Sequence, residues 1–116
     1  MRKARYLMIA SMDVDPAHED LFNEVYDTEH VPHLSKVPGV LGVSRYKRGE
    51  LNINIGGEKK TIRAEGEPAY AAVFELESPD VLTSPAWDRA VEQGRWPAQV
   101  RPFTKNRKHI LLTLLD

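Results

Sequence analysis

The residues best suited to chemistry in this 116-residue sequence lie between Tyr26 and Val40. Tyr26 and His30 are four residues apart, a spacing that places both side chains on one face of an α-helix. A histidine with an unperturbed pKa of about 6.5 can accept or donate a proton near neutral pH, and a tyrosine hydroxyl can orient a ligand. We therefore predict His30 and Tyr26 as candidate catalytic residues. The structural alternative for His30 is a helix-end histidine that bonds to a carbonyl.

A second histidine, His33, follows His30 by three residues, with carboxylates nearby, so a metal site has to be weighed. The zincin pattern places glutamate directly after the first histidine and the second histidine four positions on. In this sequence Glu29 precedes His30, and Pro32 lies between the two histidines. A solvated polar helix end explains these residues equally well. We therefore predict no metal site and keep His33 as a candidate residue of the ligand pocket.

Aromatic and basic side chains in the C-terminal third form the other candidates. Trp96 lies between Arg95 and Arg101, and an aromatic ring beside guanidinium groups can hold a flat anionic or phenolic molecule. We predict Trp96 and Arg101 as pocket residues, whereas core filling explains Trp87 better. His109 is expected to point into the space between two sheets, and a satisfied strand-end histidine is its alternative. The surrounding basic residues are most simply a solvated rim: Arg95, Arg101, Lys105, Arg107 and Lys108.

Composition limits the protein to one ordinary globular domain, spanning residues 1–116, with 41% hydrophobic residues. Lys and Arg total 16 against 17 Asp and Glu, and this net charge of -1 gives no general reason to expect nucleic acid or an acidic membrane as a partner. The absence of cysteine excludes disulfides and thiolate chemistry. The N-terminus lacks the apolar run of a secretion signal, so we expect a cytoplasmic location.

Two further classes are not expected. The longest apolar run, residues 110–115, is far shorter than the roughly 20 residues of a membrane-spanning helix. The sequence contains no phosphate-binding glycine loop, nucleophile elbow or dinucleotide fingerprint. We therefore expect no membrane partner, no ATP or nicotinamide chemistry, and no cofactor.

Alternating apolar residues predict four strands, over residues 4–12, 40–47, 69–76 and 107–115. The first helix begins with Asp15 as N-cap and Pro16 as the first helical residue, falters near Pro32 and ends at Pro38-Gly39. Its buried stripe is expected to consist of Leu21, Val25 and Thr28. A second helix is expected over residues 78–93, capped by Ser78 or Ser84 and interrupted near Pro85, with a loop over 94–104.

Residues 50–66 depart from this pattern. Apolar residues at 51, 53 and 55 alternate with asparagines and lead to Gly56-Gly57, which is typical of a tight turn between two strands. We predict a protruding hairpin inserted in the domain.

The element order is therefore strand, helix, strand, inserted hairpin, strand, helix, strand. It predicts an α+β, ferredoxin-like split βαβ fold, in which a four-stranded antiparallel sheet carries both helices on one face. The first and last strands are apolar on both sides, and soluble monomers rarely expose so large an apolar surface. We therefore predict a homodimer whose two sheets face each other.

The segment Tyr-Asp-Thr-Glu-His-Val-Pro-His-Leu from Tyr26, followed by Val-Pro-Gly-Val from Val37, resembles the first-helix signature of the dimeric α+β barrel superfamily, especially its EthD-like members. The resemblance is strongest over residues 1–48. It implies a ferredoxin-like protomer that pairs through its sheet, with a cavity between sheet and helices for small aromatic or polyketide-like molecules. Relatives include cyclases, isomerases, cofactor-free monooxygenases and haem-binding proteins. The helix histidine of the signature corresponds to His30, and its aromatic partner to Tyr26.

Two functions are consistent with these features. The first is a small cofactor-independent enzyme that acts on an aromatic or polyketide-type metabolite by proton transfer, with His30 as acid or base and Tyr26 orienting the substrate. The second is a non-catalytic dimeric binding or accessory protein, in which His30 supplies only a hydrogen bond.

Overall fold

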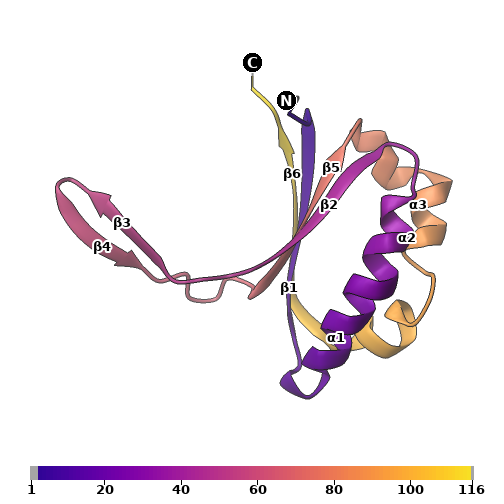
Figure 1. The fold of residues 1–116 in the computed structure, drawn as a ribbon, viewed down its shortest axis with the longest axis horizontal. Helices are drawn as coiled ribbons and strands as arrows, with labels where there is room; N and C mark the ends of the chain where they lie inside the picture. Colours follow the sequence, from indigo (N-terminus) through magenta and orange to yellow (C-terminus); the bar gives the residue numbers. More distant parts are fainter. Residues whose placement is uncertain (1–2, 116) are drawn as a thin grey trace.

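The computed structural model describes residues 3–115 and contains a four-stranded antiparallel sheet with helices packed on one face (Figure 1). The strand order is β2-β5-β1-β6. These four strands are β1 (Tyr6–Val14), β2 (Val40–Lys47), β5 (Tyr70–Leu76) and β6 (Thr104–Thr113). Because every neighbouring pair is antiparallel, this order is the ferredoxin-like split βαβ arrangement that the sequence predicts.

The helical layer contains two series of short helical segments. The first series connects β1 to β2 and comprises η1 (Pro16–His18), α1 (Glu19–Val25), η2 (Tyr26–His30) and α2 (Val31–Ser35). The second series connects β5 to β6 and comprises η3 (Pro79–Thr83), α3 (Pro85–Ala90), η4 (Trp96–Val100) and η5 (Arg101–Phe103).

The first series begins as predicted and remains helical past its proline. The Asp15 side chain accepts a hydrogen bond of 3.1 Å from the Ala17 backbone amide. Before Pro32 the helix widens into a π-helical turn, η2, in which the amide of Val31 donates to the carbonyl of Tyr26. Proline lacks an amide and its ring crowds the carbonyl four residues earlier, so an irregular turn at this point is the expected response. The turn is where the sequence predicts that the helix falters.

The predicted buried stripe of this helix is wrong at Thr28, which is exposed, and its hydroxyl bonds to the Glu24 carbonyl at 2.7 Å. Tyr26 and His30 occupy the core-facing side of the turn, so Thr28, two residues after Tyr26, lies on the opposite side. Val25 is buried as predicted and Leu21 is half-buried, and the helix also buries Phe22, Tyr26, His30 and Leu34.

The second series differs from the predicted single helix followed by a loop. Ser78 and Ser84 each cap a separate helix, because their hydroxyls accept hydrogen bonds of 3.2 Å from the amides of Asp80 and Trp87. The segment predicted as a loop over 94–104 contains the helical turns η4 and η5. Burial of Trp96 and Val100 explains this difference, because both side chains must reach the core from one short segment.

The core lies between the helices and one face of the sheet. Alternate residues of the two central strands point toward the helices, and the paired positions Met8 with Phe74 and Ala10 with Ala72 are all buried. The opposite face carries exposed apolar side chains, including Tyr46, Ile110 and Leu112. The strands are therefore apolar on both sides, as predicted, and in the described part of the chain no helix packs on this outer face (Figure 1).

The inserted hairpin is present and extends away from the sheet (Figure 1). Its strands are β3 (Leu51–Ile55) and β4 (Glu58–Ile62). Gly56 and Gly57 both have positive φ, 61° and 82°, a conformation that favours glycine in a two-residue turn. In the part of the chain that the structure describes, no helix is long and apolar enough to cross a membrane.

Candidate functional site

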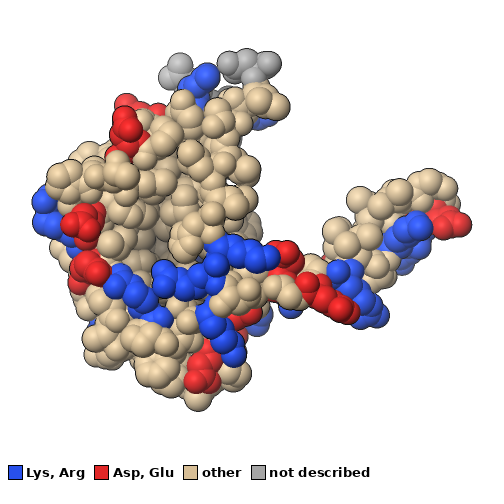
Figure 2. Space-filling view, turned by 180° about the vertical axis from the view of Figure 1, so that it is seen from behind, with Lys and Arg blue, Asp and Glu red and all other residues tan. Residues whose placement is uncertain are grey.

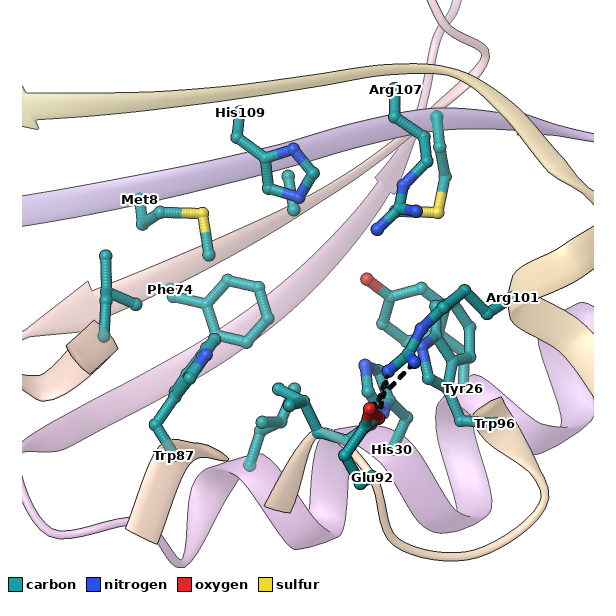
Figure 3. Close-up of a pocket in the computed structure, with 15 residues that line it drawn as sticks. Met8, Tyr26, His30, Phe74, Trp87, Glu92, Trp96, Arg101, Arg107 and His109 are labelled. Carbon is teal, nitrogen blue, oxygen red and sulfur yellow. Dashed lines mark hydrogen bonds and ion pairs between the residues drawn. The ribbon is translucent and has the colours of Figure 1, made fainter. Parts of the chain in front are cut away.

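A cavity of about 410 Å³ lies between the helix-facing side of the sheet and the helical layer (Figure 3). Its volume falls within the roughly 300–1,000 Å³ of ordinary ligand pockets. Most of its wall is apolar or aromatic, and its polar lining residues are Tyr26, His30, Glu92, Arg101, Arg107 and His109. The cavity therefore combines a hydrophobic interior with a few polar groups that could orient a ligand.

The aromatic wall is formed where the two π-helical turns, η2 and η4, meet. The imidazole of His30 stacks on the indole of Trp96, with ring centroids 4.1 Å apart and planes inclined by 13°. The ring of Tyr26 meets both of these rings edge-on, and its centroid lies 4.9 Å from that of Trp96 and 5.2 Å from that of His30. On the other side of the cavity Trp87 packs edge-on against Phe74 at 5.4 Å. Trp87 is therefore partly buried against the core and also lines the cavity.

The hydroxyl of Tyr26 points into the cavity (Figure 3). Burial raises the pKa of Tyr26 to about 12, although Arg45 and Arg107 favour the phenolate. The Arg45 guanidinium lies 4.4 Å from the centre of the tyrosine ring and is itself held by Asp27 and Asn23, at 2.7 and 2.8 Å. Tyr26 therefore keeps its proton at neutral pH and can donate a hydrogen bond to a ligand oxygen.

His30 is 5% exposed, and its Nδ1 is buried without a hydrogen-bond partner among the described residues. Burial, with smaller contributions from Arg101 and His33, lowers the pKa of His30 to about 3. General bases work best when their pKa lies near the operating pH. At pH 7 this imidazole is neutral, and it is better suited to hydrogen bonding than to accepting a proton.

Lowering the pH from about 7 to about 5 is expected to reduce the free energy of unfolding by roughly 2 kcal/mol through His30. The unfolded imidazole binds a proton below its ordinary pKa of 6.5, whereas the folded one, with a pKa of about 3, stays neutral. The loss therefore begins near pH 6.5 and grows until the pH falls to about 3. Urea unfolding of the wild type and of His30→Gln at both pH values measures it, and an equal loss in both proteins contradicts the expectation.

One control variant isolates this effect from the other titrating groups. His109→Gln removes the other pocket histidine, whose pKa is also lowered by burial. Three carboxylates also have lowered pKa values, but their stabilising contributions are lost only below the ordinary pKa, 4.5 for glutamate and 3.8 for aspartate, which lies outside this pH window. They are Asp13, Glu29 and Glu92.

The basic side of the cavity contains two arginines in different states. Arg101 is held by the Glu92 carboxylate, at 2.6 and 3.0 Å, and by the Val91 carbonyl at 2.9 Å. Arg107 also lines the cavity but makes no hydrogen bond or ion pair with any residue that the structure describes. Figure 2, the view from behind, shows a row of basic side chains across this side of the molecule. Arg107 is therefore exposed, as expected of a rim residue, and it also lines the cavity.

His109 faces the helices and not the space between two sheets, which corrects its expected orientation. It pairs across the ladder with Ala10, a buried residue of the helix-facing side, and it points into the cavity near Arg107 (Figure 3). Burial, followed by the charge of Arg107, lowers the pKa of His109 below its ordinary value. His109 is the more exposed of the two pocket histidines.

The structure thus brings together five of the six predicted site residues and separates the sixth. Tyr26, His30, Trp96, Arg101 and His109 line one cavity, whereas His33 lines a neighbouring one. Arg107 and Glu92 were missed by the sequence analysis. Arg107 could have been found from its spacing, because it lies two residues before His109 on the same strand. Among the described residues, no group of three or more His, Asp or Glu side chains is arranged to hold a metal ion.

No protein-family model matches the sequence, and no curated protein is significantly similar to it. Solved structures do share its fold. An EthD family protein from Bacillus halodurans has a TM-score of 0.56 at 11% identity, covering 95% of this chain and 99% of its own. The heme-degrader MhuD from Mycobacterium tuberculosis was solved with two hemes in its active site. It has a TM-score of 0.55 at 15% identity, and the match covers 96% of this chain and 97% of its own.

A dimeric ferredoxin-like protein of unknown function from Thermobifida fusca has a TM-score of 0.56 at 15% identity, covering 98% of this chain and 94% of its own. At such low identity these likenesses establish the fold alone. The chain therefore shares the ferredoxin-like α+β fold of these structures, as predicted.

Proposed function

We propose that the protein binds a planar aromatic or polyketide-type molecule and, without a cofactor, takes from it the proton whose loss leaves a phenolate or enolate. The observation that carries this proposal is the unpaired guanidinium of Arg107 at a cavity whose wall is mostly apolar and aromatic. An anionic oxygen beside Arg107 gains a charge-assisted hydrogen bond, while the flat body of the ligand contacts Trp87 and Trp96.

The remaining polar groups then take complementary roles. The protonated hydroxyl of Tyr26 donates a second hydrogen bond to the ligand oxygen, and the neutral imidazole of His30 offers a further polar contact. His109 is the proton acceptor, because it lines the cavity and is the less buried pocket histidine. A proton taken from a ligand hydroxyl or activated carbon would leave the negative charge beside Arg107, where it is stabilised.

The second candidate is a non-catalytic binding or accessory protein with the same ligand. The lowered pKa of His30 favours it, since an imidazole with a pKa of about 3 contributes binding more readily than acid–base catalysis. In either case we propose that two copies pair through the apolar outer faces of their sheets. The exposed Ile110 and Leu112 and the dimeric relative from Thermobifida fusca support this assembly.

Ligand-induced thermal stabilisation tests the proposal, with a panel of phenolic, quinone, lactone and haem compounds. A ligand at about 100 times its dissociation constant is expected to stabilise the protein by roughly 2.7 kcal/mol. For any ligand that binds and is turned over, His109→Gln is expected to lower kcat by about 10²- to 10⁴-fold with binding retained.

The outcomes separate the two functions. Binding without turnover in the wild type supports the non-catalytic protein. If kcat is unchanged in His109→Gln, His109 is not the proton acceptor. If none of the anionic aromatic compounds stabilises the protein, the proposal as a whole is contradicted.

A further inference from the structure

We propose that the β3–β4 hairpin, residues 51–62, is a clasp arm that docks onto a second copy of the chain. This inference rests on the proposed dimer through the outer sheet faces. It assigns the hairpin a role in the assembly that neither the cavity nor the sheet explains.

The root of the clasp arm is fixed to the body by polar contacts. Asn106 donates from its amide to the Asp13 carboxylate at 3.1 Å and to the Gly66 carbonyl at 2.8 Å. Lys108 pairs with Glu67 at 3.1 Å. Asn106 has a φ of 51° and lies at an irregularity in the pairing of β1 with β6, where strands commonly bend. These contacts set the direction in which the arm leaves the sheet.

That direction is away from the helices, into the space in front of the outer sheet face (Figure 1). Because the root is fixed, the arm is held off its own sheet, and all ten residues of β3 and β4 are exposed. An isolated two-stranded hairpin is marginally stable in water at best. A covering surface is therefore expected, and it has to come from outside the chain.

One face of the clasp arm is mostly apolar, although Lys60 and Glu58 of β4 lie on it opposite Ile53 and Ile55. Leu51, Ile53 and Ile55 alternate along β3, and Ile62 lies directly opposite Leu51. Their exposed fractions run from 42% to 50%. The other face of β3 carries the polar Asn52 and Asn54.

A second copy is the occupant that these features favour. The arm and the outer face of the sheet border the same space (Figure 1), and both carry exposed apolar side chains, Ile53 and Ile55 on the arm and Ile110 and Leu112 on the sheet. A copy seated on the outer face would lie alongside the arm, and the two-fold symmetry of such a pair would place the second arm against the first copy. Both surfaces would then be covered in one assembly.

Sedimentation velocity over a concentration series tests the clasp arm in the full chain. The double variant Ile53→Glu with Ile55→Glu is expected to raise the dimer dissociation constant about 10-fold or more, because it places two charges in an apolar contact. The matched control, Asn52→Glu with Asn54→Glu, adds the same charges to the other face and is expected to stay within about twofold of the wild type. Circular dichroism confirms that both variants fold.

A third variant separates this inference from the dimer itself. Ile110→Glu, on the outer sheet face, is expected to abolish the dimer. If it does so while both arm variants retain the wild-type dissociation constant, the sheet dimer stands and the clasp arm is overturned. If the wild type remains monomeric at about 100 µM, both proposals are overturned. A dimer that buries a whole sheet face and the hairpin would associate more tightly than this concentration requires.

Discussion

Replacing Arg107 with glutamine is expected to weaken binding of an anionic aromatic ligand by about 10- to 100-fold. A hydrogen bond to a charged group contributes roughly 1.5–3 kcal/mol, and each 1.4 kcal/mol changes the dissociation constant about tenfold. The guanidinium makes no hydrogen bond or ion pair with a described residue, so its removal leaves no protein partner unsatisfied. The effect on the dissociation constant should therefore appear without loss of stability, and isothermal titration calorimetry with unfolding curves measures both.

Lys108→Gln is the matched control for this variant. Lys108 is the next residue on β6 and faces the opposite side, where it pairs with Glu67 at 3.1 Å. The two substitutions remove the same charge from neighbouring positions, so a long-range electrostatic effect would weaken binding equally in both. A neutral analogue of the ligand should be insensitive to Arg107→Gln. Equal weakening by the two substitutions would contradict a direct contact.

The fold was predictable because its determinants are local. Apolar alternation indicated the four strands, and Asp15-Pro16 marked the start of the first helix. The pair Gly56-Gly57 indicated the hairpin turn, since both residues adopt the positive φ that glycine favours. Each of these signals lies within a few residues of the element that it specifies.

The site was harder to predict because it depends on contacts between distant segments. Tyr26 and His30 were identifiable from their spacing on one helix, but their stacking partner Trp96 comes from a segment predicted as a loop. Two π-helical turns bring these rings together, and such turns have no clear sequence signal. Arg107 looked like one of several surface cations, and only the pairing of β6 with β1 shows that it faces the cavity.

Electrostatics was the least predictable property. The sequence analysis made His30 a candidate acid or base because an unperturbed imidazole has a pKa of about 6.5. The structure buries it beneath Trp96 and near Arg101, and both the burial and the charge disfavour its protonated form. The residue that looked most suited to proton transfer is therefore better suited to binding, and this is why we propose His109 as the acceptor.

Trp96→Ala is expected to reduce the free energy of unfolding by about 3–5 kcal/mol, the largest change in stability that we expect from a single pocket substitution. The indole is 3% exposed and is in ring contact with His30, Tyr26 and Phe22. Its removal leaves a void that the two short helical turns cannot close without moving. Domains of this size have a total stability of about 5–15 kcal/mol, so a large part of it would be lost.

Urea unfolding at a fixed protein concentration measures this loss, because dimer formation would otherwise contribute to the apparent stability. Trp87→Ala is the control, since Trp87 is only partly buried and its ring contact in the described structure is with Phe74. We expect Trp87→Ala to reduce the free energy of unfolding by less than Trp96→Ala does. The void would also admit water to His30 and raise its pKa toward 6.5, so the pH dependence between 7 and 5 should shrink in Trp96→Ala. A large loss of stability with an unchanged pH dependence would mean that the neutral state of His30 does not depend on the stacked indole.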